Sequence, residues 1–266
     1  MFLTWASFSA LFAQQTEYEN WTGIFYEICP DTTNLARYTE DNEIYKAENT
    51  YYFTYTYKDK SNKEFYFSRL PDRTWEFVPK ETMKDSAITG FYMKILPDIS
   101  SFMDFLPDYN QTVIKYTAMM NSGSVNTSFS ESTGLVENSM NIWMHPPRFN
   151  LFKILEINPF PFIQKPYEKG NKWYWSLEIG YQWGDYRWKE WDDNIENQYT
   201  YEIVDTNSII YTPLGELHCY KIDSFAESKL GKTYLTAYFN ETYGFVKLEY
   251  INIDNSTITI LLNNVE

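Results

Sequence analysis

The amino-acid sequence predicts a mainly β protein, in which an antiparallel, curved sheet or open half-barrel carries one or two short covering helices. Aromatic residues make up 20% of the chain, and aromatic and β-branched side chains suit the pleated, half-buried surface of a strand. From Gly170 to the C-terminus, stretches of alternating apolar and polar residues are separated by short turns. Closely spaced strands of this kind are typical of an antiparallel meander.

The N-terminus has the composition of an export signal. Residues 2–13 are almost all apolar or small and carry no charge. This run is shorter than the about 20 apolar residues that span a bilayer, and it is typical of the apolar core of a secretory signal. We therefore expect residues 1–14 to be a signal peptide and the protein to be exported, to the periplasm or the extracellular space. No Lys or Arg precedes the run, which is unusual for such a signal; the alternative is a buried N-terminal strand or helix.

The remaining residues, 15–266, are expected to form a single β-rich domain, with a sub-boundary near 150–170. No later stretch is long and apolar enough to predict a membrane span. The formal net charge of −14 disfavours nucleic acid as a partner, because both molecules would be negatively charged. The sequence leaves the oligomeric state open.

The first half of the chain combines strand patterns with less regular segments. Two aromatic-rich runs, residues 49–59 and 61–70, predict a β-hairpin, and residues 74–79 add a third short strand. Residues 82–110 have partly helical apolar spacing interrupted by prolines, so we expect one or two short helices or an irregular covering segment. The proline-rich residues 146–166 should run extended over a surface, because a residue before proline is pushed towards extended geometry.

The stretch Gly231-Lys232-Thr233 matches the loose form of a phosphate-binding loop. Such a loop must be followed by a helix whose N-terminal N–H groups face the phosphates. The residues after Lys232 alternate between polar and apolar side chains as a strand does, so we predict a hairpin whose turn contains Gly231. The sequence therefore predicts no nucleotide site, and no pattern in it indicates a cofactor.

Cysteine and histidine are rare in this chain. Cys29 and Cys219 could form a disulfide in an oxidising compartment, and the alternative is two buried free thiols. His145 and His218 do not combine with the cysteines into the spacing of zinc ligands, so no metal site is predicted. His218 and Cys219 are neighbours in a predicted strand, where successive side chains point to opposite faces, which argues against a catalytic pair.

Tryptophan is concentrated in one part of the chain, because five of the nine Trp residues lie between residues 173 and 191. A period of two places Trp173 and Trp175 on the same face of a predicted strand as Leu177 and Ile179. This face could pack into the core, or it could form an aromatic wall that stacks a sugar or encloses an apolar ligand. Trp173 and Trp175 are therefore candidate ligand-binding residues.

A second candidate set consists of Trp143, His145 and Arg148. It places a large aromatic ring, a titratable ring and a permanent cation in one short stretch that contains two prolines. These residues could form a binding rim. The alternative is a strand that ends against the prolines, with Arg148 paired to a carboxylate.

Two motifs near the C-terminus resemble those of a group of uncharacterised secreted bacterial β-proteins. YTPLGELHCYKI, residues 211–222, has the pattern TP-x-G-x-x-x-C-x-K-I. YFNETYGFVKLEY, residues 238–250, matches the pattern Y-x-x-x-x-G-x-V-K at Gly244, Val246 and Lys247, with Tyr238 or Tyr243 in place of its tyrosine but neither at the spacing of the pattern. Gly170–Trp173 also fits the group as G-x-K-W. The resemblance is confined to the chain from Gly170 onward. It implies a strongly curved antiparallel sheet like the half-barrels of bacterial lipoprotein carriers, and it brings no catalytic residues with it.

Three functions of different classes follow from these features. The first is a non-enzymatic envelope protein that binds an apolar or glycan ligand in the concave face of the sheet. The second is a structural or interaction subunit without a small-molecule site, which a large exposed aromatic patch would favour. The third is a glycan hydrolase, which needs two carboxylates facing each other across a cleft, one of them with a raised pKa.

Overall fold

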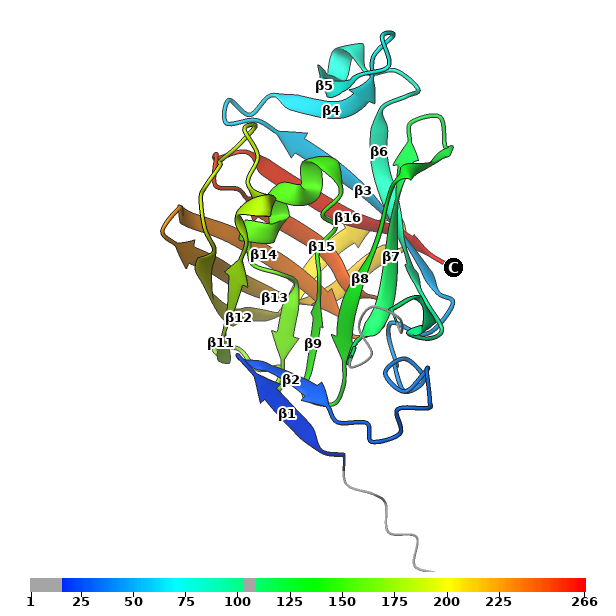
Figure 1. Ribbon diagram of the computed structural model, residues 1–266, viewed down its shortest axis with the longest axis vertical. Helices are drawn as coiled ribbons and strands as arrows, with labels where there is room; N and C mark the ends of the chain where they lie inside the picture. Colours follow the sequence, from blue (N-terminus) through cyan, green and yellow to red (C-terminus); the bar gives the residue numbers. More distant parts are fainter. Residues whose placement is uncertain (1–15, 103–108) are drawn as a thin grey trace, which may run out of the picture.

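The computed structural model describes residues 16–102 and 109–266. The described chain is mainly β, and its antiparallel sheet curves into a nearly closed barrel (Figure 1). This confirms the predicted fold class. The expected signal peptide, residues 1–14, lies outside the described residues. No helix within the two described ranges has the length and apolar character needed to cross a membrane.

The elements are short and follow one another closely along the chain. Their bounds are β1 Tyr18–Trp21, β2 Ile24–Glu27, β3 Thr50–Lys58, β4 Glu64–Arg69, β5 Trp75–Pro79, η1 Lys80–Thr82, β6 Ile88–Ile95, η2 Ser100–Phe102, β7 Thr112–Met120, β8 Val125–Glu137, β9 Asn141–Met144, η3 Asn150–Ile157, β10 Phe162–Gln164, β11 Lys172–Ile179, η4 Tyr181–Trp183, β12 Ile195–Thr212, β13 Gly215–Ser228, β14 Gly231–Asn240, β15 Gly244–Ile251 and β16 Thr257–Val265, where η marks a 3-10 helix.

The wall of the barrel is a 14-stranded sheet whose main path runs β10-β9-β8-β7-β6-β3-β16-β15-β14-β13-β12-β11. Strands β11 to β16 form the predicted antiparallel meander. β16 then pairs with β3, so the two halves of the chain share one sheet and one main core. The connection from β9 to β11, residues 145–171, contains η3 and then β10, which is an edge strand of this same sheet.

The barrel closes where its two edge strands, β10 and β11, approach each other. The side-chain amide of Asn171 donates a hydrogen bond to the carbonyl oxygen of Gln164, at 3.1 Å. The ring centroids of Phe162 in β10 and Trp173 in β11 lie 5.7 Å apart. Side chains, rather than a ladder of backbone hydrogen bonds, therefore join the two edges.

The N-terminal hairpin, β1–β2, lies across this seam at the bottom of Figure 1. Gln164 Nε2 donates to the carbonyl oxygen of Gly23 at 2.8 Å. The side chain of Asn141 accepts from the N–H of Phe25 at 2.8 Å and donates to its carbonyl at 3.1 Å, as a neighbouring strand would. Gly23 has φ +116°, and a Cβ there would lie 2.0 Å from the carbonyl oxygen of Tyr174 in β11. Only glycine allows the hairpin to approach the wall this closely.

The β4–β5 hairpin, which we call the flap, lies at the opposite end of the barrel, at the top of Figure 1. Phe67 of β4 stacks on Trp75 of β5, with ring centroids 5.6 Å apart. Trp75 in turn meets Phe129 of β8 edge to face at 4.8 Å. The predicted hairpin over residues 49–70 and the third short strand over residues 74–79 are both confirmed.

The prediction for residues 82–110 is wrong over β6, which is a strand of the wall paired with both β3 and β7. The strand pattern was hidden at Gly90, where the pairing with β7 shifts its register. A Cβ at Gly90 would lie 2.2 Å from the carbonyl oxygen of Phe53, which explains why a glycine interrupts the strand. Residues 103–108 of this region lie outside the described residues.

The prediction that residues 146–166 run extended over a surface is wrong over η3. This eight-residue 3-10 helix is buried, and its side chains Leu151, Phe152, Ile154 and Leu155 belong to the main core. The prolines flank the helix rather than interrupt it, and its many apolar residues make burial favourable. Phe149 and Asn158, which flank η3, and the short strand β10 are extended as predicted, but β10 lies in the wall of the barrel with Phe162 buried rather than over a surface.

The rejection of a phosphate-binding loop is confirmed. Ser228 of β13 pairs with Gly231 of β14, so the two strands form a tight hairpin. Thr233 lies within β14 rather than at the start of a helix, and its hydroxyl donates to the carbonyl oxygen of Ile157 at 2.9 Å. The Gly-Lys-Thr sequence therefore has a structural role in the hairpin.

The two cysteines are free thiols, so a disulfide between Cys29 and Cys219 is wrong for this structure. Cys29 donates to the carbonyl of Arg37 at 3.6 Å, whereas Cys219 donates to that of Leu217 within β13 at 3.7 Å. Burial raises the pKa of each thiol to about 11. Both are therefore protonated at neutral pH and have little nucleophilic character.

Candidate functional site

The predicted aromatic wall is part of the core. Trp143, Trp173 and Trp175 are only 2%, 3% and 5% exposed. Trp175 stacks on Tyr199 of β12 with ring centroids 4.5 Å apart, and Trp173 stacks on Tyr201 at 5.4 Å. Trp143 meets Trp175 edge to face at 5.5 Å. The structure thus brings three of the five candidate ligand-binding residues together, in a closed cluster.

Phe160, which follows η3, packs against this cluster, and Phe152 of η3 fills the interior beside Tyr55 and Phe91. Phe152 and Phe160 are both 0% exposed, and the Phe160 ring lies 5.2 Å from that of Trp175. The indole N–H groups of Trp143 and Trp173 have no hydrogen-bond partner among the described residues, which is a cost of packing amphipathic rings inside the barrel. In this part of the barrel, the concave face is occupied by the chain's own side chains.

His145 packs against the same cluster. Its ring centroid lies 4.9 Å from that of Trp143 and 5.0 Å from that of Phe160. Burial, and then the positive charge of Arg148, lower the pKa of His145 well below its ordinary value. The imidazole is therefore neutral at physiological pH, and its surroundings are those of a core residue.

Arg148 lies between the carboxyl groups of the buried Glu156 and the half-buried Glu131, as the second interpretation of this stretch predicted. Its Nε lies 3.8 Å from Glu131 Oε2, and its Nη1 lies 3.6 Å from Glu156 Oε1. The guanidinium also lies over the ring of Trp183, 5.2 Å from its centroid. Burial raises the pKa of both glutamates to about 7, although the charge of Arg148 lowers each. We call this arrangement the Glu131–Arg148–Glu156 triad.

The triad predicts that stability falls as the solution becomes more alkaline. A carboxyl group whose pKa is raised by folding binds its proton more tightly in the folded state, so its contribution is full below its unfolded pKa and is lost as the pH rises through the folded value. We expect the free energy of unfolding to decline less between about pH 5 and about pH 8 in Glu131→Gln/Glu156→Gln than in the unmodified protein. Chemical denaturation across this range measures the difference. Equal slopes for the two proteins would contradict the burial of these carboxyls.

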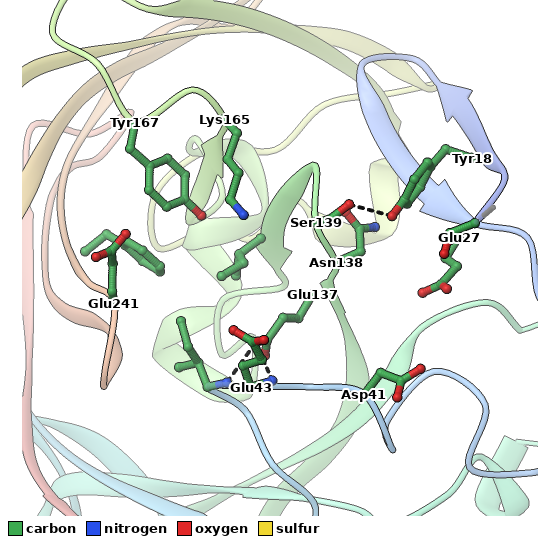
Figure 2. Close-up of a pocket in the computed structure, with 14 residues that line it drawn as sticks. Tyr18, Glu27, Asp41, Glu43, Glu137, Asn138, Ser139, Lys165, Tyr167 and Glu241 are labelled. Atoms are coloured by element: carbon green, nitrogen blue, oxygen red, sulfur yellow. Dashed lines mark hydrogen bonds between the residues drawn. The ribbon is translucent and has the colours of Figure 1, made fainter. Parts of the chain in front are cut away.

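A hollow of about 570 Å³ opens at the base of the barrel, beside the N-terminal hairpin, and we call it the base pocket (Figure 2). It is formed by segments far apart in the sequence. Its lining residues are Thr16, Tyr18, Glu27, Asp41, Glu43, Ile44, Glu137, Asn138, Ser139, Ile142, Lys165, Tyr167, Phe239 and Glu241.

Glu137, the last residue of β8, fixes one wall of the base pocket. Its carboxylate accepts hydrogen bonds from the backbone N–H groups of Glu43, Ile44 and Tyr45, at 2.9, 2.8 and 2.8 Å. Burial raises the pKa of Glu137, and these N–H groups act in the opposite direction. Three charge-assisted hydrogen bonds hold the turn before β3 against β8, so Glu137 stabilises the pocket itself.

Acidic side chains dominate the lining of the base pocket. The five carboxyl groups belong to Glu27, Asp41, Glu43, Glu137 and Glu241, and the lining contains one cation, Lys165. Within the part of the chain that the structure describes, none of the five is in an ion pair. Burial and then the charge of Asp41 raise the pKa of Glu27. The concentration of unpaired carboxylates gives the pocket a negative potential.

Aromatic rings form the less polar walls of the base pocket. Figure 2 shows Tyr167 and Glu241 on one side and Tyr18 and Glu27 on the other. The Tyr167 ring lies 5.6 Å from that of Phe239, and Tyr18 is held by a 2.6 Å hydrogen bond between its hydroxyl and that of Ser139. Aromatic faces and carboxylates together attract organic cations, by cation–π and Coulomb interactions respectively.

The acidic surface continues into an adjoining hollow of about 540 Å³, which shares Thr16, Glu27 and Asp41 with the base pocket. This hollow adds the carboxyl groups of Glu17, Asp31 and Glu40. Arg37 is its one cation, and its guanidinium is engaged with a backbone carbonyl, that of Asn34, at 2.9 Å. Among the described residues, no group of three or more His, Cys, Asp or Glu side chains is arranged to hold a metal ion.

No pattern in the sequence points directly to the base pocket. Its carboxyl groups are spread from Glu27 to Glu241 and come together only when the N-terminal hairpin, the β8–β9 turn and the β14–β15 turn meet at one end of the barrel. The available clue was the acidic composition of the first turns, such as Asp41 and Glu43. The candidate residues Trp143, Trp173 and Trp175 lie in the core instead.

Comparisons with known proteins identify no family for this chain. No protein-family model matches it, and no curated protein matches it. One similar solved structure is a Bacteroides fragilis protein described as exported with a YmcC-like fold, with a TM-score of 0.45 and 11% identity over 84% of this chain and 97% of that chain. Another is a Parabacteroides distasonis protein described as a lipoprotein, with a TM-score of 0.46 and 11% identity over the same shares. Both similarities extend beyond the C-terminal region in which the sequence resemblance lay, and at these TM-scores they support no functional assignment.

Proposed function

We propose that the protein is an exported, non-enzymatic binding protein whose base pocket takes an organic cation, such as an amine or a basic peptide side chain. The observation that carries the proposal is a partly enclosed hollow of about 570 Å³ with five carboxyl groups, one lysine and two tyrosines in its lining. Export is supported by the apolar, uncharged run at residues 2–13.

The expected ligand follows from the composition of the pocket. The carboxylates of Glu27, Asp41 and Glu241 supply the charge that an ammonium or guanidinium group needs, while Tyr167 and Phe239 supply contact for its carbon chain. Glu137 already accepts three backbone hydrogen bonds, so it contributes charge to the site while holding its wall. The burial of Trp173 and Trp175 in the core favours a site at the end of the barrel over an apolar or glycan ligand in the concave face.

Isothermal titration calorimetry with spermidine tests this function. We expect saturable binding that weakens as the salt concentration rises, because part of the attraction is screened. Glu27→Gln/Asp41→Asn/Glu241→Gln should abolish the binding. The matched control, Glu190→Gln/Asp193→Asn/Glu196→Gln, removes equal charge from an exposed region outside the pocket and should retain it. Binding that is absent, or equally weak in both triple variants, would refute the proposed site.

A glycan hydrolase is the second candidate. Such an enzyme needs a carboxyl group with a raised pKa as its general acid and a second carboxylate nearby, and burial and the charge of Asp41 raise the pKa of Glu27. Assaying reducing-sugar release from a mixture of bacterial and plant polysaccharides separates the two functions. Hydrolysis that disappears in Glu27→Gln would replace the binding function with catalysis. Polysaccharides that remain intact would favour the non-enzymatic function.

A further inference from the structure

The flap end of the barrel carries a second kind of hollow, with the opposite charge. A depression of about 450 Å³ is lined by Arg69, Leu70, Pro71, Arg73, Lys84 and Ser86. Three of these six residues are cations, and none is acidic. This composition is unusual in a chain with 22 cations and 36 acidic residues.

The three cations are available to a ligand. Arg69, Arg73 and Lys84 are all exposed, and no ion pair within residues 16–102 and 109–266 includes any of them. Asp72, next to Arg73, uses one carboxylate oxygen to accept hydrogen bonds from the N–H and hydroxyl groups of Thr74, at 3.0 and 2.7 Å. The positive charge at the flap is therefore not neutralised by an ion pair within the described chain.

A hollow of about 400 Å³ continues from this depression and shares Arg69 and Ser86 with it. Its wall contains the half-buried indole of Trp75 together with aliphatic groups from Met120 and Val125. The polar members of its lining are Arg69, Asp85, Ser86, Ser122, Asn126 and Thr127. Asp85 is the one carboxylate in either hollow. An aromatic ring surrounded by short polar side chains is a composition that suits a sugar ring and its hydroxyl groups.

Hydrogen bonds and stacked rings hold the walls of the two hollows together. The Ser86 hydroxyl donates to the backbone carbonyl of Arg69 at 3.0 Å, which ties the flap to the segment before β6. The N–H of Ser122, at the β7–β8 turn, donates to the carbonyl of Asp85 at 3.1 Å. The Trp75 ring is held in place by stacking on Phe67 and by an edge-to-face contact with Phe129. The groove is thus built from three segments that are already joined.

We propose that the two hollows form one groove, the flap groove, which binds an anionic saccharide: Arg69, Arg73 and Lys84 receive its carboxylate, sulfate or phosphate group, and Trp75 contacts a sugar ring. The planar guanidinium groups of two of these residues suit oxyanions, because each can donate two parallel hydrogen bonds. The short polar side chains near Trp75 can exchange hydrogen bonds with sugar hydroxyls. This site lies at the other end of the barrel from the base pocket and does not depend on the cation-binding function.

Calorimetric titration with a galacturonic acid oligosaccharide tests the flap groove, with a neutral galactose oligosaccharide of equal length and inorganic phosphate as parallel probes. We expect binding of the uronic acid oligosaccharide that weakens with salt, and much weaker binding of the other two probes. Arg69→Gln/Arg73→Gln/Lys84→Gln should weaken it by about tenfold or more, because three charge-assisted contacts are lost. Trp75→Phe should weaken the binding of the uronic acid oligosaccharide without changing the affinity for inorganic phosphate.

The matched control is Lys46→Gln/Lys115→Gln/Lys169→Gln, which removes equal charge from exposed positions outside the groove and should retain the affinity. Equal loss in both triple variants would mean that only the overall charge matters and would overturn the proposal. Phosphate binding as tightly as the oligosaccharide would overturn the assignment of a saccharide, and equal binding of the neutral oligosaccharide would overturn the role of the cations. Circular dichroism of each variant verifies that the barrel is intact.

Discussion

Replacing Arg148 by methionine is expected to lower the free energy of unfolding by about 3–5 kcal/mol near pH 8, because it leaves one buried and one half-buried carboxyl group without their cation. Arg148 lies 3.8 Å from Glu131 and 3.6 Å from Glu156. The side chain of Glu156 is 5% exposed and that of Glu131 18%, so water can replace little of the lost interaction. Urea denaturation followed by tryptophan fluorescence measures the loss.

The same substitution should cost less at about pH 5, because both carboxyl groups can then be protonated and need no counter-charge. The control is Lys94→Met, which removes a lysine from a 2.7 Å ion pair with the exposed Glu48. An exposed ion pair contributes about 0–1 kcal/mol, so the control should remain close to the unmodified protein. A loss in Arg148→Met no larger than in the control, at both pH values, would show that the triad does not stabilise the fold.

Trp175→Ala is expected to destabilise the protein by about 3–5 kcal/mol, as is usual when a large aromatic side chain is removed from a packed core. The Trp175 ring contacts Tyr199, Phe160 and Trp143 at centroid distances of 4.5, 5.2 and 5.5 Å. η3 is held inside the barrel by the structure around it, so the cavity cannot easily collapse. Thermal and urea denaturation measure the effect.

Tyr174→Ala is the matched control, because Tyr174 is the next residue of the same strand and is 63% exposed on the outer face. It should change the free energy of unfolding by no more than about 0.5 kcal/mol. If Trp175→Ala were as stable as this control, the inner face of β11 would be an open surface rather than core.

Much of the fold could be predicted from local sequence, because a strand with one buried face shows its period directly. Trp173 and Trp175 alternate with the exposed Lys172 and Tyr174, and the same alternation continues through β16. Local turn chemistry also identified the β13–β14 hairpin at Gly231. The prediction was wrong where tertiary structure overrides the local pattern: at Gly90, which breaks the period of β6, and at η3, which folds between prolines because the barrel encloses it.

The candidate sites were harder to predict, because each depends on contacts between distant segments. Pairing with a carboxylate was one of two interpretations of Arg148, and the partners Glu131 and Glu156 could not be chosen among 36 acidic residues. The base pocket requires Glu27 and Glu241 to meet at one end of the barrel. The alternation of apolar and polar residues shows on which face of a strand a side chain lies. It does not show which strands close the barrel or which turns come together at the same end of it.

The central claim is that the chain fills the concave face of its barrel with its own aromatic residues; the two proposed ligand sites lie at the ends of the barrel. Titration with N-phenyl-1-naphthylamine, an apolar dye, tests it most directly, because a dye next to Trp143, Trp173 or Trp175 would quench their fluorescence. We expect no saturable quenching and no saturable rise in dye fluorescence. Saturable binding of one dye molecule per chain, with quenching that is reduced in Trp175→Phe, would place an open cavity where the structure has a packed core.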